Sequence, residues 1–401
     1  MDFYGYMRPN GKAGARNYVL LLPVNRSLNF IASNVERMTR NTRHFEIPAE
    51  TGRTEVDREV IARTLIGLMN NANVGGIVLL AVKSGAGSAY KNMCAERFEE
   101  EARKTGKPFR IVYLTNVGGS YNMLGETLRL TREVLLEVSD FRRENCPLSA
   151  LTLGVKCGTS DATSGIAGNP CVGAAFDQLI RVGGTAFFSE TTEIIGAEDL
   201  VAKRAVNESV AKKILSAARH WEDKAKATGE DIRKINPIPA NIAAGISSLE
   251  EKSLGAIAKS GTSPIQDVLK YAEMPKGSGL YFVDSWMSSL SLPLCLTACG
   301  ATIMLYQMGG GKIAQHPMMP SINPTVVSPF LYLTGNAIAY SRAPDNFDFD
   351  ASPIMTEGAS IPEMGTKLLE HLSAIASGTM TKMETLNYAE QLELYMEGPV
   401  L

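Results

Sequence analysis

Residues 151–198 read LTLGVKCGTSDATSGIAGNPCVGAAFDQLIRVGGTAFFSETTEIIGAE and contain one strand–helix–strand unit. The apolar run at 151–155 predicts a buried strand, and the apolar periodicity of 171–182 predicts a helix. A glycine pair then turns the chain into a second apolar run at 185–189. Two strands joined through a helix lie parallel in one sheet, so this stretch predicts an open α/β fold.

Reactive side chains follow both predicted strands. Cys157 and Asp161 come after the first strand, and Glu190 and Glu193 come after the second. The carboxyl ends of parallel strands meet at one edge of the sheet, which is where open α/β sheets bind ligands. A thiol and carboxylates are ligand types that a ferrous ion can use, so Cys157, Glu190 and Glu193 form a candidate metal group. The alternative is that the two glutamates only stabilise the N-terminus of a helix that begins near Gly196.

The rest of the chain repeats the alternation of strand and helix. Apolar runs such as 18–24 and 76–82 alternate with amphipathic helical stretches, which predicts another parallel sheet covered by helices. A polar, proline-bearing segment at 139–149 indicates a domain boundary. The expected fold class is α/β, with two doubly wound, mainly parallel-sheet, Rossmann-like domains at 1–145 and 146–401.

Within the second domain, the pattern predicts a helix at 265–271, a strand at 280–283 and a glycine loop, GGGK, at 309–312. The loop lacks the spacing of a phosphate-binding loop, so it is interpreted as a tight turn. Because reactive groups gather at strand ends, the ligand site is expected between the two domains, facing Cys157 and Glu190.

The composition excludes several classes of protein. The 401 residues carry 40 Lys and Arg against 42 Asp and Glu, a formal net charge of −2, so nothing indicates a nucleic-acid partner. The start MDFYGYMRPNGK lacks the apolar run of a signal peptide, and no apolar stretch reaches the roughly 20 residues of a transmembrane helix. Six dispersed cysteines without a CxxC pair argue against a disulfide framework. A cytoplasmic protein that makes no contact with membranes is expected.

Two lysines stand near a loop rich in hydrogen-bond donors. Lys252 and Lys259 share one face of a predicted helix, and Lys259 is followed by Ser260, Thr262 and Ser263. Backbone and hydroxyl donors beside an ammonium group suit the binding of a carboxylate. The alternative is that both lysines are solvated, as surface lysines usually are.

Four motifs carry a resemblance to a known family. They are KCGTSDATSGIAGNP at 156–170, SETTEIIGAEDL at 189–200, GYMRPNGKAGARNYVLLLPV at 5–24 and SLEEKSLGAIAKSGTSPIQDVLKY at 248–271. Together they resemble the altronate and galactarate dehydratase family, in its large catalytic region. The resemblance implies a hydro-lyase that depends on iron or another divalent metal and acts on a small hydroxy acid of the sugar-acid type.

The resemblance and the residue types together give a set of candidate site residues. The catalytic candidates are Lys156, Asp161, Lys83 and Lys259. The candidates for substrate binding are Arg16, Asn17, Ser160, Ser164, Asn169, Ser260, Thr262 and Ser263. The metal candidates are Cys157, Glu190 and Glu193, which would hold Fe²⁺ or Mn²⁺.

This chemistry has three requirements. Removal of water from a dihydroxy acid needs a base for the proton beside the carboxylate, a cation for the resulting enediolate, and an acid for the departing hydroxide. A divalent ion meets the second requirement and can assist the third. The candidate group is therefore of the kind that the implied reaction needs.

The chain also departs from the family pattern. Residues 25–27 and 83–87 stand where the family has cysteines, and Ile242, Gly310 and Asn323 stand at or near positions where it has Lys or Arg. Replaced thiols and cations predict a diverged substrate. They leave two alternatives open: a non-catalytic paralogue or regulatory subunit, and the large subunit of a carbon–sulfur lyase that acts on a sulfonated hydroxy acid.

Two kinds of protein partner are expected. Family dehydratases often carry a small N-terminal domain, either fused or as a separate subunit, so the resemblance implies a separate small partner subunit. The apolar C-terminal residues YMEGPVL favour homo-oligomerisation.

Overall fold

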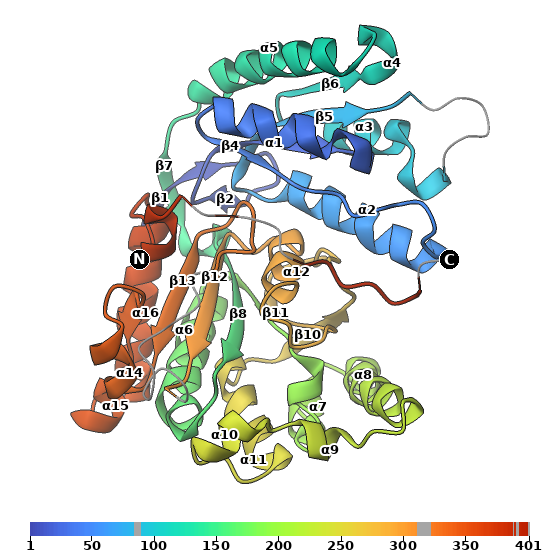
Figure 1. Cartoon of the computed structure of the whole chain (residues 1–401). Coiled ribbons are helices and arrows are strands. Elements are labelled where there is room, and N and C mark those ends of the chain that lie inside the picture. The colour runs from blue at the N-terminus through green and yellow to red at the C-terminus, as the bar shows by residue number, and fades with distance from the viewer. Residues whose placement is uncertain (84–89, 311–321, 388, 390–392, 400–401) are drawn as a thin grey trace.

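The computed structural model describes residues 1–83, 90–310, 322–387, 389 and 393–399. Figure 1 shows two parallel sheets covered by helices, with the N-terminal sheet above the C-terminal one, and a short third sheet beside their junction. The predicted α/β class with two mainly parallel sheets is confirmed.

The N-terminal sheet has four parallel strands in the order β4-β3-β5-β6. Its strands are β3 (Tyr18–Pro23), β4 (Thr42–His44), β5 (Val74–Ala81) and β6 (Phe109–Tyr113). The main helices around it are α1 (Asn29–Met38), α2 (Glu55–Asn70), α3 (Ala95–Lys104) and α5 (Ser120–Ser139), and the short α4 (Leu114–Val117) follows β6. Helices α1 and α5 cover one face and α2 and α3 the other, which is why the central strands β3 and β5 are apolar along almost their whole length (Figure 1).

The C-terminal sheet has seven parallel strands in the order β10-β11-β9-β8-β12-β13-β14. Its strands are β8 (Thr152–Gly158), β9 (Thr185–Phe188), β10 (Ile265–Leu269), β11 (Gly279–Val283), β12 (Ile303–Met308), β13 (Phe330–Thr334) and β14 (Phe349–Asp350). The strand order reverses between β8 and β12, because the chain passes from β8 to β9 on one side and from β12 to β13 on the other. Such a switch point leaves room for a ligand at the strand ends.

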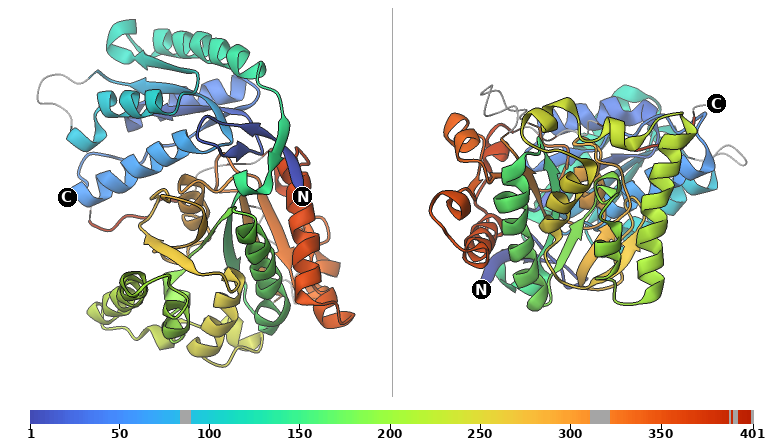
Figure 2. Two further views of the ribbon diagram at one scale, coloured as in Figure 1. Left: turned by 180° about the vertical axis from the view of Figure 1, so that it is seen from behind. Right: turned by 90° about the horizontal axis from the view of Figure 1, so that it is seen from below.

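Helices of very different length surround this sheet. They are α6 (Asn169–Arg181), α7 (Glu198–Ala202), α8 (Glu208–Ala227), α9 (Ile232–Ile235), α10 (Pro239–Ala243), α11 (Leu249–Ile257), α12 (Leu292–Ala298), α14 (Ala337–Arg342), α15 (Pro353–Thr356), α16 (Ile361–Ala376) and α17 (Lys382–Thr385). Helices α6 and α16 pack side by side, as the view from behind shows (Figure 2). Among the described residues, no helix combines the length and hydrophobicity needed to cross a membrane.

The amino ends of the C-terminal strands face the N-terminal part of the chain. Asn71, which follows α2, donates from Nδ2 to the carbonyl oxygens of Thr297 and Ala301, both at 2.9 Å. Asn73 donates to the carbonyl oxygen of Thr302, just before β12, at 2.8 Å. The carboxyl ends of the same strands therefore point away from the N-terminal sheet, towards α10 and α11 (Figure 1).

The third sheet joins the chain terminus to the segment between the two larger sheets. β1 (Asp2–Met7) pairs antiparallel with β2 (Ala13–Gly14) on one side and with β7 (Glu144–Pro147) on the other. The boundary predicted after residue 145 falls inside β7.

The helix predicted at 265–271 is wrong. This segment forms β10, which pairs in parallel with β11 at the edge of the sheet. The run IQDVLKY is too short for its periodicity to distinguish a helix from a strand, and the β-branched residues Ile265 and Val268 favour the strand.

Candidate active site

Strand ends bring the candidate metal group together. Cys157 lies near the end of β8, Glu190 follows β9, and Glu193 ends the short turn η5 (Thr191–Glu193). All three side chains are buried, and one ligand atom of each lies within 4.8 Å of the others. The thiol donates to Glu190 Oε2 at 3.4 Å and to Glu193 Oε2 at 3.3 Å.

An ammonium group lies among these three side chains. Lys259, in the turn η6 (Ala258–Ser260), donates to Glu190 Oε2 and lies 3.2 Å from Cys157 Sγ. Its Nζ is also 3.9 Å from Glu193 Oε2. Gly173 of α6 allows η6 to come this close, because a Cβ there would lie 2.2 Å from the carbonyl oxygen of Ala258.

Two further lysines complete the arrangement. Lys156 Nζ lies 3.3 Å from Glu190 Oε1, and Lys252 Nζ lies 3.2 Å from Glu193 Oε1. None of the six residues is more than 7% exposed. They are referred to below as the buried cluster: Lys156, Cys157, Glu190, Glu193, Lys252 and Lys259.

Burial and charge together set the protonation of the buried cluster. Burial raises the pKa of the Cys157 thiol and Glu190 raises it further, so the thiol keeps its proton at neutral pH. Burial would also raise the pKa of Glu193, but the three lysines, Lys252 first, lower it to about 2. Burial opposes the charge on Lys259, yet Cys157 and Glu190 outweigh it and hold the pKa of the ammonium above its ordinary value. The charged groups are thus held in place by one another.

The backbone at Glu190 is strained in a way that serves the site. Its φ of +75° lies in the left-handed region, which costs a residue with a Cβ about 1 kcal/mol. The turn sends the carboxylate back over β8, where Glu190 Oε2 accepts from the backbone N–H of Cys157 at 3.1 Å. Surrounding contacts maintain this conformation, so the carboxylate position is fixed before any ligand arrives.

The donor set fits a divalent ion in chemistry and in spacing. One thiol and two carboxylates, all buried and close together, are of the types that can ligate a divalent metal ion. Loading an ion there would require Cys157 to lose its proton and Lys259 to withdraw, because the Lys259 ammonium lies among the same three atoms. The structure therefore contains a group that could hold a metal ion, with a lysine in competition for it.

A cavity of about 310 Å³ opens beside the buried cluster. Every described residue on its wall lies between 156 and 306, so this cavity belongs to the C-terminal sheet and not to the space between the two sheets. A larger cavity of about 920 Å³ runs between α8 and β10, but no member of the buried cluster lines it. Eight polar side chains line the smaller cavity: Lys156, Thr159, Ser160, Glu193, Asn241, Lys252, Ser289 and Tyr306.

Sequence reasoning missed Asn241, Ser289 and Tyr306, which lie outside the recognised motifs. Tyr306 of β12 hydrogen-bonds through its hydroxyl to Ser289 Oγ at 2.8 Å, and Lys156 Nζ lies 5.1 Å from its ring centroid. Asn241 of α10 donates to the carbonyl oxygen of Ser160 at 2.9 Å. No motif marks these residues. The one available signal was that β12 ends at the same sheet edge as β8 and β9.

Asp161 lies in a network of its own. Its Oδ1 accepts from Thr163 Oγ1 at 2.6 Å and from the Ser164 N–H at 3.1 Å. Its Oδ2 accepts from the Gly310 N–H at 2.6 Å and from Asn336 Nδ2 at 2.9 Å. These contacts tie the loop after β8 to the segments that follow β12 and β13.

Three residues after β8 were predicted to bind substrate, and only one of them, Ser160, reaches the cavity. The Ser164 hydroxyl accepts from the Asp161 N–H at 3.2 Å, and Asn169 donates to the carbonyl oxygen of Gly255 at 2.9 Å. Ser164 and Asn169 thus hold the loop and the start of α6 in place.

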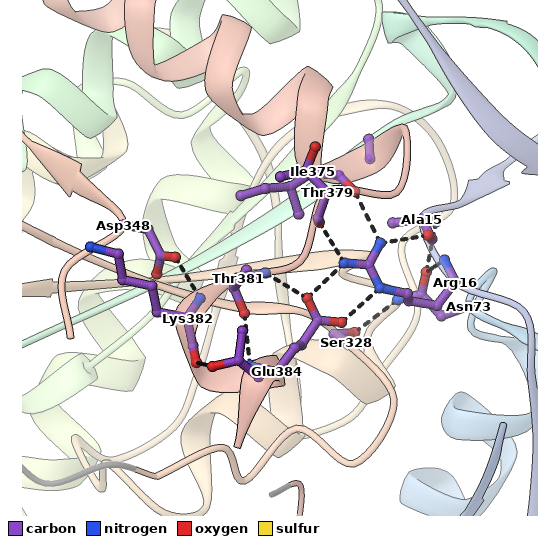
Figure 3. Close-up of polar contacts among 12 residues, drawn as sticks. Ala15, Arg16, Asn73, Ser328, Asp348, Ile375, Thr379, Thr381, Lys382 and Glu384 are labelled. Atoms are coloured by element: carbon purple, nitrogen blue, oxygen red, sulfur yellow. Dashed lines mark hydrogen bonds and ion pairs between the residues drawn. The ribbon is translucent and has the colours of Figure 1, made fainter. Parts of the chain in front are cut away.

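Arg16 and Asn17 do not reach the buried cluster. Arg16 makes a bidentate ion pair with Glu384 of α17, with both N···O distances at 2.6 Å, and donates to backbone carbonyls including that of Thr379 (Figure 3). Asn17 accepts from Arg8 at 2.9 Å and donates to the carbonyl oxygen of Val138 at 3.0 Å.

The donor-rich loop after Lys259 binds a carboxylate of the chain itself. Thr262 and Ser263 donate through backbone N–H and hydroxyl groups to Asp177 of α6, at 2.6 to 2.9 Å. Ser260 Oγ accepts from Arg204 at 2.8 Å.

Lys83 is exposed and follows β5 of the N-terminal sheet. No contact between described residues joins it to the buried cluster. Residues 84–87, part of the segment that departs from the family pattern, lie outside the described residues, as do the end of the GGGK loop and the rest of 311–321.

Comparison with known proteins agrees with the resemblance of the motifs. Residues 148–399 match the family model for the C-terminal part of D-galactarate/altronate dehydratase. Residues 5–139 match the model for the second domain of D-galactarate dehydratase/altronate hydrolase.

Three relatives illustrate the range of activities. The (2R)-sulfolactate sulfo-lyase subunit beta of Chromohalobacter salexigens is 32% identical over 97% of this chain and 96% of its own length. The galactarate dehydratase (L-threo-forming) of Escherichia coli is 30% identical over 99% of this chain and 77% of its own length. The altronate dehydratase of Bacillus subtilis is 29% identical over 100% of this chain and 78% of its own length. The chain is a member of the D-galactarate/altronate dehydratase family.

Proposed function

We propose that this protein is a lyase that eliminates water from a hydroxylated carboxylic acid of the sugar-acid type, assisted by Fe²⁺ or Mn²⁺. One observation carries the proposal. In a chain of a dehydratase family, a buried thiol–carboxylate group and two lysine ammonium groups meet at the wall of a cavity large enough for a small acid.

The lysines at the cavity wall suit the binding of an acid. Burial disfavours the charged form of Lys156, but Tyr306 and Glu190 outweigh it and hold its pKa above the ordinary value. Lys156 therefore stays protonated and, with Lys252, can hold the substrate carboxylate and the negative charge that spreads onto it when the neighbouring carbon loses its proton. The hydroxyls of Ser289 and Tyr306 can hydrogen-bond to substrate hydroxyls.

A divalent ion held by Cys157, Glu190 and Glu193 would supply Lewis-acid stabilisation of that charge and of the departing hydroxide. The overall change is balanced: one C–H and one C–O bond break, water leaves, and the resulting enol becomes a 2-oxo acid. The ammonium of Lys259 provides the positive charge among these donors when no ion is bound.

A carbon–sulfur lyase is the second candidate, favoured by the sulfo-lyase subunit that aligns over 96% of its length. In that reaction the C–S electron pair leaves with sulfite, which needs no proton to depart, while the same lysines hold the carboxylate. The product distinguishes the two candidate functions, because only the carbon–sulfur lyase releases sulfite.

The metal content of anaerobically purified protein tests the site. We expect stoichiometric iron or manganese in the wild type by mass spectrometry, and its loss in Cys157→Ala and Glu190→Ala. Asp267→Asn, a change at an exposed ion pair, is the matched control and should keep the metal.

Assays for 2-oxo acid and for sulfite on a panel of hydroxy acids and sulfonated hydroxy acids then identify the leaving group. Absence of metal in every sample, with no turnover, would indicate a non-catalytic paralogue or regulatory subunit.

A small separate subunit is part of the proposal, because the sulfo-lyase relative is itself named as a beta subunit. Affinity purification that recovers only this chain, with full activity, would contradict it. Homo-oligomerisation and a cytoplasmic location also remain predictions. The apolar tail that favoured an oligomer packs within the chain, where Leu394, Tyr395 and Met396 contact the core.

A further inference from the structure

We propose that the C-terminal tail, residues 393–399, positions one wall of the cavity, acting through the loop 284–291. This inference depends on the function proposed above only in its kinetic test. Met287 and Ser289 of this loop line the cavity, whereas no described tail residue does. Any effect of the tail on substrate is therefore indirect, and its residues are positioning residues.

The tail is tied to both halves of the molecule. The backbone N–H groups of Glu397 and Gly398 donate to Oδ1 of Asp57, at 2.6 and 3.1 Å. Asp57 is fully buried in the first turn of α2, beside which the tail ends in Figure 1. Lys224 of α8 donates to the Tyr395 hydroxyl at 2.8 Å and to Glu397 Oε1 at 2.9 Å. A segment of seven residues is thus held by α2 on one side and α8 on the other.

The first link to the cavity runs through Ser288. Glu393 Oε2 accepts from the Ser288 hydroxyl at 2.5 Å. The Ser288 oxygen in turn accepts from the backbone N–H groups of Leu290 and Ser291, at 3.1 and 3.3 Å. A hydroxyl that donates to a carboxylate becomes a stronger acceptor, so Glu393 tightens the turn of the loop.

This turn fixes the neighbouring residue that faces the cavity. Ser289 Oγ hydrogen-bonds to the Tyr306 hydroxyl at 2.8 Å, and the Tyr306 ring lies beside Lys156. A loop that loses its Ser288 contact can shift Ser289, and with it the polar lining next to the buried cluster.

The second link runs through the two tryptophans of the chain. The Tyr395 ring centroid lies 5.7 Å from that of Trp221 and 6.2 Å from that of Trp286. Trp221 donates through Nε1 to Asp284 Oδ1 at 2.9 Å, and Thr191 Oγ1 donates to the same oxygen at 2.8 Å. Thr191 directly follows Glu190 in the chain and begins the turn η5 that ends at Glu193. Tail packing therefore also supports the turn that carries the two carboxylates.

The contacts suggest matched variants. Glu393→Ala removes the acceptor for Ser288, while Glu393→Gln keeps an amide oxygen that can still accept. Tyr395→Ala removes the ring between the tryptophans, while Tyr395→Phe keeps it. Lys213→Ala, at an exposed ion pair of α8 with Asp267, is a control that touches neither the tail nor the loop.

Three measurements on the whole protein test the proposal. Both alanine variants should speed hydrogen exchange in peptides covering 284–291. Tyr395→Ala should also change the fluorescence of the two tryptophans, the only ones in the chain. On a turned-over substrate, Glu393→Ala should raise KM about tenfold, the equivalent of one charged hydrogen bond, with kcat within about twofold. Glu393→Gln, which keeps a neutral acceptor, should raise KM less than Glu393→Ala does, while Tyr395→Phe and Lys213→Ala should stay close to the wild type.

The outcomes keep this inference separate from the proposed function. Unchanged exchange in the loop of both folded alanine variants would overturn the positioning role, whatever the activity. An equal loss in Glu393→Gln and Glu393→Ala would also overturn it. If the wild type turns over no acid, the proposed function fails, while hydrogen exchange and fluorescence still decide the role of the tail.

Discussion

Lys259 presents its ammonium group to the three atoms that could otherwise hold a metal ion. Lys259→Met removes this charge and leaves Glu190 buried with a weaker counter-charge. We expect the metal-free variant to lose about 3–5 kcal/mol of unfolding free energy, as when one partner of a buried ion pair is removed. Because the competing ammonium is gone, added Mn²⁺ or Fe²⁺ should bind more tightly than in the wild type and restore much of the loss.

Thermal unfolding after chelation, with and without added ion, measures both effects. Lys213→Met, at an exposed ion pair, is the control and should change stability by less than about 1 kcal/mol. If an added ion stabilises the wild type as much as it stabilises the Lys259→Met variant, Lys259 and the metal ion do not compete.

The residue types in this sequence predicted which kinds of contact would form better than they predicted which residues would form them. Strand ends predicted that Cys157, Glu190 and Glu193 would meet, because the edge of a parallel sheet gathers them regardless of the rest of the chain. The donors at Thr262 and Ser263 do bind a carboxylate, as their types indicate, but the carboxylate is that of Asp177 in the same chain. A sequence can show that a group of donors suits an anion, but it does not show which anion those donors bind.

At the scale of elements, α17 is joined to the sheet through a half-buried carboxylate. Asp348 accepts from the backbone N–H of Lys382 in α17 at 2.8 Å (Figure 3). It also accepts from the backbone N–H of Tyr332 in β13 at 2.9 Å. Burial outweighs these donors and raises the pKa of Asp348 to about 6. Its unfolded value is about 3.9, so the folded state binds this proton more tightly and ionisation of Asp348 costs stability.

This sign gives a pH dependence. The penalty should be absent below about pH 4, grow as the pH rises to about 6, and be complete above it, with a size on the order of 3 kcal/mol. Asp348→Asn does not titrate. We expect the unfolding free energy of the wild type, minus that of Asp348→Asn, to fall between pH 4.5 and 7 in urea unfolding. Parallel curves would contradict the shifted pKa, and the exposed Asp223→Asn serves as the control.

Element boundaries were predictable where long apolar runs are covered on both faces, and not at sheet edges. The central strands β5 and β8 are buried along nearly their whole length, which leaves a clear apolar run in the sequence. The edge strand β10 is half-buried and only five residues long, so its pattern matched a helix equally well. The position of α10 beside the cavity depends on contacts of Asn241 with a segment 81 residues away, which no local pattern encodes.

At the scale of the whole molecule, Arg16 joins the N-terminal part of the chain to its C-terminal helices. Its guanidinium is about nine-tenths buried and pairs with Glu384 (Figure 3). Arg16→Met should cost about 3–5 kcal/mol, because Glu384 is left without its buried counter-charge. Limited proteolysis should then cut the C-terminal segment faster.

A double variant, Arg16→Met with Glu384→Leu, removes both charges and should recover much of the stability lost in the single variant. Chemical unfolding of the double variant beside the single variants Arg16→Met and Glu384→Leu measures this recovery. If the double variant is as unstable as the sum of the two single changes, the pair does not act as a unit.

The buried cluster also sets the order in which the protein can fold while it is being synthesised. Glu190 and its partner Lys259 are 69 residues apart, so a ribosome adding about 5–20 residues each second makes the lysine several seconds after the glutamate. During that interval the carboxylate has no Lys259 to neutralise it and is better left in water than buried. The edge between β8 and β9 should therefore remain open on the nascent chain, and the C-terminal sheet should close only after η6 has left the ribosome.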